Sequence, residues 1–180
     1  VDVEILDEAL IGTDGLHRRL GADIVGIQAN SSLTYNRALD IARRAKLTRR
    51  GPLVVLGGPY AALKARQILD ARPVVDLIVS GPGETPMLDI ANAAATGSPK
   101  SNFEGIVGVW TRDSTGNVRE PIALAKWDFE RPRPLDYSLI PVSDYHTNYR
   151  RRFGNRSQGS FQIFTHFGCL YRDIRLRSGR

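Results

Sequence analysis

Short apolar runs alternate with amphipathic stretches through the first half of the chain. Four runs have the length of buried strands: Val3–Leu6, Asp23–Gln28, Val54–Leu56 and Leu77–Val79. The stretches between them repeat apolar side chains every three or four residues, which is typical of helices with one buried face. Strands separated by such helices form parallel βαβ units with right-handed crossovers. The pattern therefore predicts a doubly wound α/β domain over residues 1–100.

Four helices are expected on the two faces of this Rossmann- or flavodoxin-like sheet. Asp14 is suited to cap a short helix, Thr34 is suited to cap a long one, and Pro86 fits the first turn of the last helix. The side chains predicted to face the sheet are Leu16, Leu20, Ala38, Ile41, Ala42, Ala45, Ala62, Ala65, Ile68, Leu69, Met87, Leu88, Ala91, Ala94 and Ala95.

The pattern changes beyond Gly97. Two runs, Gly105–Thr111 and Val118–Leu124, flank Asp113–Asn117, whose composition is typical of a hairpin turn. We therefore assign residues 101–127 to a β-hairpin that extends the α/β domain.

A proline-rich stretch, Phe129–Pro141, follows the hairpin and predicts a linker, which we extend over residues 128–158. Ser160–Thr165 then alternates like the first strand of a new domain. Residues 159–180 are accordingly interpreted as the start of an incomplete second domain.

Two of the predicted strands end in glycine-rich turns. Gly57-Gly58-Pro59 follows the third run, and Gly81-Pro82-Gly83 follows the fourth. Ligands of open α/β sheets bind just outside the carboxyl ends of the strands, and glycine there lets a bulky ligand approach the backbone. The two turns therefore predict a broad, flat ligand lying across this edge of the sheet.

Composition narrows the class of protein. The net charge of +6 would suit nucleic acid, but the basic residues are spread over helix faces and the end of the chain, so we expect no nucleic-acid partner. A single cysteine, Cys169, excludes an internal disulfide and fits a reducing cytoplasm. No apolar run is long enough to span a membrane, so we expect no membrane partner.

The order and spacing of three phrases resemble those of a known family. ADIVGIQANSSLTYNRALDIARRAK is followed by VVLGGPYA and then by VDLIVSGPGETPMLDI. With the hairpin, the linker and FTHFGC, they resemble the cobalamin-binding domain of cobalamin-dependent radical SAM enzymes, followed by a degenerate start of the radical SAM domain. The resemblance extends from about Val3 to Cys169, and it implies a cobalamin-binding domain related to methyltransferases that is not catalytic alone.

The resemblance also implies a set of cofactor-binding residues. In the family the corrin lies over the carboxyl ends of the strands, and its nucleotide tail passes between strands and helices. Ser31-Ser32-Leu33 matches the family's Ser-x-Leu motif, and Gly57-Gly58 matches the glycine pair that leaves room for the tail. The candidate cofactor-binding residues are Asn30, Ser31, Ser32, Leu33, Thr34, Gly57, Gly58, Pro59, Tyr60, Ser80, Gly81, Gly83 and Glu84. Taken singly, these residues are as typical of ordinary βα turns, where serine caps a helix and glycine eases a bend.

The sequence departs from the family at the cobalt ligand. The histidine of D-x-H-x-x-G is absent, and Asp14-Gly15-Leu16-His17 has the wrong spacing. The implied mode is therefore base-off cobalamin without a protein imidazole, and His17 is interpreted as a surface residue. Val3–Leu6 resembles the family's second strand, so the first strand and its loop are expected to precede Val1.

A second departure concerns the iron–sulfur cluster. The family's [4Fe-4S] cluster needs C-x-x-x-C-x-x-C, but Asp173 and Leu176 occupy the positions that would follow Cys169. Cys169 is interpreted as a vestigial metal position, and the [4Fe-4S] cluster and S-adenosylmethionine of intact relatives are not expected here. No catalytic residue is identified. Two alternatives stay open. One is a stand-alone α/β binding or sensor module for another nucleotide-like ligand, and the other is an enzyme of the flavodoxin or sugar-nucleotide type, for which the sequence shows no catalytic pair.

Overall fold

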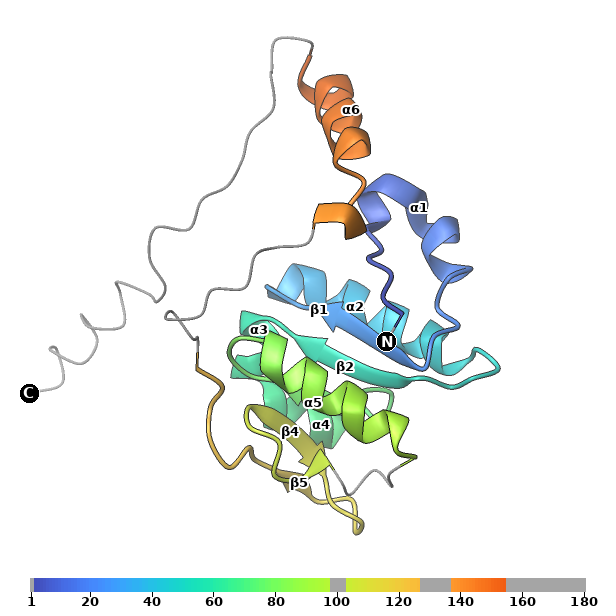
Figure 1. Cartoon of the computed structure of the whole chain (residues 1–180). Helices are drawn as coiled ribbons and strands as arrows, with labels where there is room; N and C mark the ends of the chain where they lie inside the picture. Colours follow the sequence, from blue (N-terminus) through green and yellow to red (C-terminus); the bar gives the residue numbers. More distant parts are fainter. Residues whose placement is uncertain (1, 98–102, 127–136, 155–180) are drawn as a thin grey trace, which may run out of the picture. The chain divides into compact units, whose positions relative to one another are not determined.

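The computed structural model describes residues 2–97, 103–126 and 137–154. The chain divides into two compact units, residues 1–139 and 140–180. The first unit is built on a five-stranded sheet in the order β1-β2-β3-β4-β5 (Figure 1). The strands are β1 (Ile24–Gln28), β2 (Leu53–Gly57), β3 (Leu77–Val79), β4 (Val109–Arg112) and β5 (Val118–Arg119). β1, β2 and β3 run parallel, and β4 and β5 add an antiparallel hairpin, which confirms the predicted α/β fold.

Among the described residues of the first unit, four helices cover one face of the sheet and a fifth covers the other. They are α1 (Glu8–His17), α2 (Ser32–Lys46), α3 (Pro59–Leu63), α4 (Ala65–Ala71) and α5 (Glu84–Ala95). Alternate side chains of a strand point to opposite faces. Val54 and Leu56 accordingly pack with residues of α1 to α4, whereas Val55 packs with Ile90 of α5. Figure 1 shows α5 in front of the sheet, with α2 and α4 behind it.

The amino-terminal residues differ from the prediction. Val3–Leu6 forms no strand, and Val3 and Ile5 are 52% and 46% exposed. These residues join no described ladder, so nothing holds them in a sheet. The first helix also begins earlier than expected, because the Asp7 carboxylate accepts a hydrogen bond from the Ala9 N–H (2.8 Å) and caps α1.

Two later helices also need correction. The single helix expected after β2 is divided at Lys64, whose φ of −109° and ψ of 16° leave the helical range, into α3 and α4. In α5 the inward side chains include Ile90, which is fully buried, while Leu88 is 45% exposed. The expected inward face was therefore wrong at Leu88 and at Ala95, which is also exposed, because the exact rotation of the helix depends on its packing against β2 and β3.

The hairpin is confirmed, with shorter strands than predicted. The Asp113 carboxylate accepts hydrogen bonds from the N–H groups of Thr115 and Asn117, both at 2.9 Å. Thr115 Oγ1 also donates to it, and this bond, with the two backbone bonds, lowers the pKa of Asp113 to about 2. The ionised side chain therefore organises the turn between β4 and β5.

The rest of the chain contains one short and one longer helix in the described residues. A 3₁₀ turn, η2 (Tyr137–Leu139), precedes α6 (Val142–Phe153), which belongs to the second unit. α6 lies in the span interpreted as a linker, where no helix was predicted. The expected strand Ser160–Thr165 and Cys169 lie outside the described residues. None of the helices in the described ranges has the length and apolar content needed to cross a bilayer.

Candidate functional site

The carboxyl end of β1 leads directly into a capped helix. The Ser31 hydroxyl accepts a hydrogen bond from the Thr34 N–H (3.3 Å), and Thr34 Oγ1 accepts one from the Ser31 N–H (3.0 Å). This reciprocal capping box fixes the first turn of α2. The Asn30 N–H also donates to Thr34 Oγ1 (3.0 Å). Asn30 and the Ser31-Ser32-Leu33 motif stay exposed, so they are accessible at this edge of the sheet.

Gly57 and Gly58, at the end of β2, have different surroundings. A Cβ on Gly58, where φ is +98°, would lie 2.8 Å from both the Ala29 carbonyl oxygen and Asn30 Oδ1. Glycine is therefore required there by the backbone and by the neighbouring turn. A Cβ on Gly57 would have no described atom within 4 Å. Open space at this turn thus lies at Gly57 rather than at Gly58.

The hairpin and the chain that follows it contact the carboxyl end of β3. Ser80 is buried, and its Oγ accepts a hydrogen bond from Trp110 Nε1 (3.0 Å). A Cβ on Gly81, where φ is +91°, would lie 2.8 Å from the Ala125 carbonyl oxygen. Ala125, in the chain after β5, therefore lies against one side of the Gly81 turn, although Gly81 itself is exposed. Gly83, two residues later, again faces open space among the described residues.

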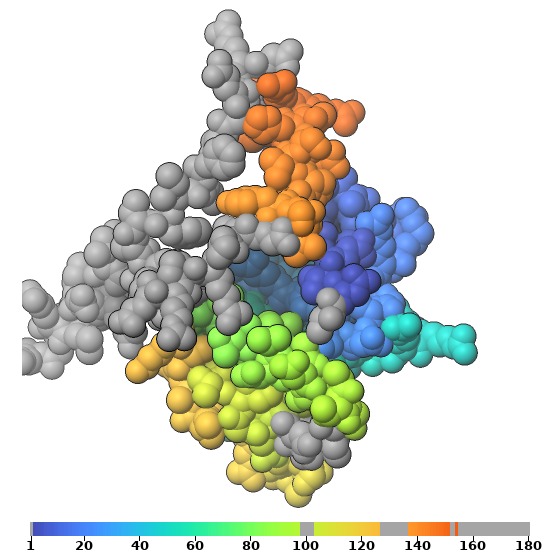
Figure 2. Space-filling model, viewed as in Figure 1, coloured from blue at the N-terminus to red at the C-terminus, as the bar shows by residue number. Residues whose placement is uncertain are grey.

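Two helix starts meet near the ends of β1 and β2. The rings of Tyr35 in α2 and Tyr60 in α3 are tilted by 41° with centroids 5.2 Å apart. Pro59, at the first position of α3, is exposed. Glu84 is the first residue of α5, and the residue before it, Gly83, has no side chain that could cap the helix. Figure 2 shows blue atoms of the β1 and α2 region set back behind the green atoms of the helices that follow β2 and β3.

Sequence reasoning missed three residues at this edge. Gln28 Nε2 donates to Asn30 Oδ1 (3.0 Å), Tyr35 pairs with Tyr60, and Gly26 is exposed within β1. The strict alternation of a strand could have shown that Gly26 and Gln28 share one face. Tyr35 lies in the same helical turn as the predicted Ser-x-Leu motif, so its closeness to that motif in the sequence could have indicated it.

A polar network between α1 and α2 accounts for His17. Arg37 Nε donates to Glu8 Oε2 (2.9 Å), and Arg37 Nη2 lies 3.4 Å from His17 Nε2. The bonds from Arg37 and then Thr13 lower the pKa of Glu8 to about 2. In the described part of the chain, no three His, Cys, Asp or Glu side chains gather as a metal site.

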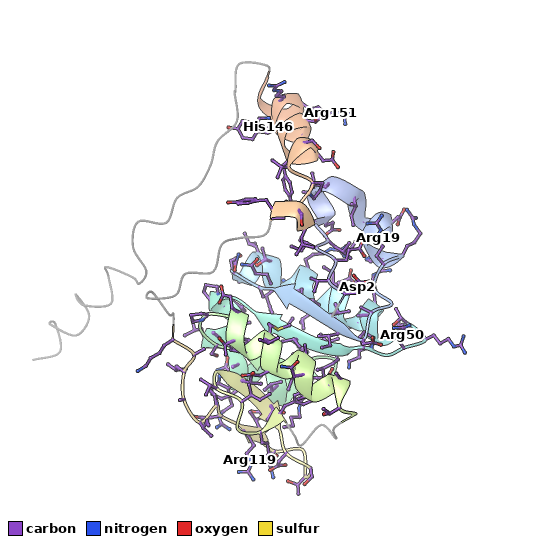
Figure 3. The ribbon with its side chains drawn as sticks, in the orientation of Figure 1. Asp2, Arg19, Arg50, Arg119, His146 and Arg151 are labelled. Carbon is purple, nitrogen blue, oxygen red and sulfur yellow. The ribbon has the colours of Figure 1, made fainter. Side chains whose placement is uncertain are left out.

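Several basic side chains of the first unit lie far apart and form local ion pairs. Figure 3 places Arg19, Arg50 and Arg119 in separate parts of this unit. Each of these three arginines has an acidic partner: Arg19 pairs with Glu4 (2.8 Å), Arg50 with Asp23 (2.9 Å) and Arg119 with Asp113 (2.7 Å). Because their charges are compensated locally, these arginines do not form a continuous basic stripe.

Known proteins resemble this chain in sequence and in fold. A family model described as B12 binding domain matches residues 2–91. A relative from Pyrococcus horikoshii, "Uncharacterized methyltransferase PH0819", is 31% identical over 151 residues, which cover 80% of this chain and 32% of the relative. The chain thus spans about a third of the length of the curated relative it matches.

A solved structure has the same fold. The cobalamin-dependent S-adenosylmethionine radical enzyme OxsB, with aqua-cobalamin and S-adenosylmethionine bound, matches with a TM-score of 0.58 and 18% identity. The match covers 77% of this chain and 19% of that protein. With a family model that spans half of its residues, the chain belongs to the B12-binding domain family.

Proposed function

We propose that the chain holds cobalamin at the carboxyl edge of β1 and β2, with the corrin near Gly57 and Gly83. The observation that carries the proposal is the open space at Gly57, between two helix starts at the edge of a parallel sheet. Neither Gly57 nor Gly83 has a positive φ, so their own backbone conformation does not require glycine. Small residues at this edge suit a wide ligand that rests against the main chain.

The polar groups around this space suit the amides of a corrin. Asn30 and Ser31 are exposed at the start of α2, and Glu84 is exposed at the start of α5. Ser32, Leu33, Thr34, Pro59 and Tyr60 complete the proposed contact region on the two helix starts. In this proposal Ser80 and Gly81 shape the turn after β3 and do not contact the cofactor, because Trp110 and Ala125 already lie against them.

The proposed binding mode leaves cobalt without a protein imidazole. His17 is the described histidine of the first unit, and it lies in the last turn of α1 beside Arg37. Bound cobalamin would supply methyl-transfer chemistry, and we propose that this chain is the cofactor-carrying part of a larger methyltransferase-type enzyme. The name of the Pyrococcus horikoshii relative supports this assignment.

Cofactor retention tests the proposal. The purified chain is incubated with hydroxocobalamin and desalted, and its visible spectrum is recorded. We expect one corrinoid per chain, with a spectrum that lacks a nitrogen axial ligand. Retention of a flavin or a nucleotide in place of the corrinoid would contradict the proposal.

A pair of glycine variants tests where the cofactor binds. Gly57→Trp places an indole in the open space, and we expect at least about tenfold weaker binding, which corresponds to 1.4 kcal/mol. Gly21→Trp is the matched control, because a Cβ on Gly21 also has no described atom within 4 Å and the residue precedes β1. Equal effects of the two substitutions would contradict a site at the carboxyl edge.

A further inference from the structure

Two hydrogen bonds join the carboxyl end of β3 to the chain around β4. The ladder between β2 and β3 ends at the pair of Leu56 and Ile78, whereas contacts with β4 continue beyond it. The Ser80 N–H donates to the Gly108 carbonyl oxygen (2.8 Å), and Trp110 Nε1 donates to Ser80 Oγ (3.0 Å). The end of β3 is therefore held against the hairpin through both the backbone and the side chain of Ser80.

Trp110 has further contacts that fix its own position. Alternation along the paired strands places Ile78, Ser80 and Trp110 on the face of α3 and α4, where the indole packs against an apolar cluster. Cζ of Arg66 lies 5.9 Å from the centroid of the indole ring, which is within the range of a cation–π contact. Arg66 Nη2 in turn donates to Glu120 Oε1 (2.6 Å). The position of the indole N–H beside Ser80 therefore depends on α4 and on the hairpin.

Ser80 leads directly into the turn before α5. Gly81 follows it with a φ of +91°, and a Cβ there would lie 2.8 Å from the Ala125 carbonyl oxygen. Gly83 is the cap residue of α5 and Glu84 is its first residue. These last two residues border the edge at which we propose that the corrin binds. Because few residues separate Ser80 from α5, a shift of Ser80 would move this border as well.

The bond between Trp110 and Ser80 lies in a buried environment. Ser80 is 5% exposed, so water has little access to its hydroxyl group. A buried hydroxyl group whose donor is removed either stays without that bond, at a cost in free energy, or moves toward water. In the second case the backbone of the following turn has to adjust.

We infer that Trp110 is a positioning residue for corrinoid binding: its indole N–H fixes Ser80, and Ser80 fixes the turn from Gly81 to Glu84. The inference rests on the proposed cobalamin site. Trp110 lies outside residues 2–91, which the family model matches, and outside every motif that predicts a cofactor-binding residue. It acts on the cofactor through the turn and does not touch it.

A set of variants separates positioning from packing. Trp110→Phe keeps an aromatic ring and removes the N–H donor, Ser80→Ala removes the acceptor, and the double variant removes both. Thr111→Val is the matched control, because Thr111 is the next residue of β4, is buried, faces the side of α5 and also loses a polar group. Hydroxocobalamin affinity is measured by equilibrium dialysis with visible absorbance. Urea denaturation and a thermal melt define a temperature at which every variant is fully folded, so that affinity is independent of stability.

The expected result follows from the shared bond. Each single variant should bind hydroxocobalamin about threefold to tenfold more weakly, which corresponds to the net contribution of one hydrogen bond. The double variant should bind no more weakly than the weaker single variant, because both substitutions remove the same interaction. Thr111→Val should keep an affinity within about twofold of that of the unchanged chain.

Failure of the inference is distinguishable from failure of the proposed function. If the unchanged chain does not bind hydroxocobalamin, the cobalamin site itself is wrong and the inference falls with it. If the chain binds and Trp110→Phe stays within about twofold of it, the site stands and Trp110 does not position the turn. Losses of affinity that add in the double variant, or a loss in Thr111→Val as large as that in Trp110→Phe, would also overturn the inference, because neither depends on the bond to Ser80.

Discussion

The two faces of the sheet are built differently although the same strands form both. On the face of α1 to α4, Val54, Leu56 and Ile78 are fully buried among helix side chains. On the face of α5, Val55 is buried, but Gly26 and Gln28 of β1 are exposed. One face thus contributes close packing that stabilises the fold. The other retains open main chain beside β1, which is where a ligand can approach.

The difference follows from alternation along two short strands. In IVGIQ, the residues that face α1 and α2 are Val25 and Ile27, while Gly26 and Gln28 face the side of α5. In β2, Leu56 faces the packed side and Gly57 the open side. Each strand therefore ends with a large apolar side chain on one face and a small or polar residue on the other. A composition count over the whole strand would hide this pattern.

The largest effect is expected from a cavity on the packed face. Ile78→Ala removes a fully buried side chain from the middle of β3, which is paired on both sides. We expect a loss of about 2–5 kcal/mol in the free energy of unfolding, measured by urea denaturation. Leu88→Ala, at an exposed position of α5, is the control and should change stability by less than about 0.5 kcal/mol. Similar losses of unfolding free energy in both variants would contradict the difference in packing between the two faces.

The second prediction concerns a partly buried ion pair, in which the carboxylate is buried and the lysine is partly exposed. Lys46 of α2 pairs with Asp76, which precedes β3, and Asp76 Oδ2 also accepts a hydrogen bond from the Val54 N–H (2.8 Å). Lys46→Met leaves the buried carboxylate without this cation, and we expect a loss of about 3 kcal/mol in unfolding free energy. Arg50→Met is the control, because its pair with Asp23 is exposed and should contribute less than about 1 kcal/mol. The urea midpoints of the two variants give the comparison.

The sequence was sufficient for the centre of the fold. The apolar runs of β2 and β3 and the amphipathic pattern of α2 have local signals strong enough to locate these elements. The sequence predicts the cap of α2 at Thr34, whereas Ser31 is the N-cap and Thr34, at the third helical position, completes its capping box. Both residues favour caps, so propensity alone does not decide between them.

Long-range contacts explain what the sequence did not predict. The close approach of Ala125 to Gly81 joins residues far apart in the chain, and no local pattern shows it. Val3–Leu6 has the pattern of a strand, but a strand also requires a partner, and none is described beside it. In the candidate site, residue type alone predicts that Gly57 and Gly58 both leave room for the cofactor. Only the neighbouring Ala29 and Asn30 distinguish the tight turn from the open one.

A smaller change in stability, which depends on pH, is expected where α1 packs on α2. The pKa of Glu8 is lowered to about 2 by its bonds to Arg37 and Thr13, compared with 4.5 for an ordinary glutamate. The ionised Glu8 carboxylate therefore contributes its full share of the free energy of unfolding above about pH 4.5, and this share is lost as the pH falls toward about 2. Glu8→Gln should lower the melting temperature at pH 7 and reduce the loss of stability between pH 5 and pH 2. His17 and Asp40 also face Arg37, so the same titration on His17→Gln is the control.

Identical pH profiles for Glu8→Gln and the unchanged chain would show that this network does not attach α1 to the packed face.

The smallest change in the free energy of unfolding is expected for a substitution at Gly26. The sign of this change tests whether the fold itself requires glycine there. A Cβ there would touch only the Met87 methyl among described atoms, at 3.8 Å, which is an ordinary contact. Because glycine in a strand costs about 0.5–1 kcal/mol relative to alanine, Gly26→Ala should raise the unfolding free energy by about 0.5 kcal/mol in the absence of ligand. Gly58→Ala, at a φ of +98° and a Cβ distance of 2.8 Å from Ala29 O, should lower it. Urea denaturation of the ligand-free chains measures both changes. A loss of stability in Gly26→Ala would mean that the fold itself requires glycine in β1, and the open face would then need no ligand to explain it.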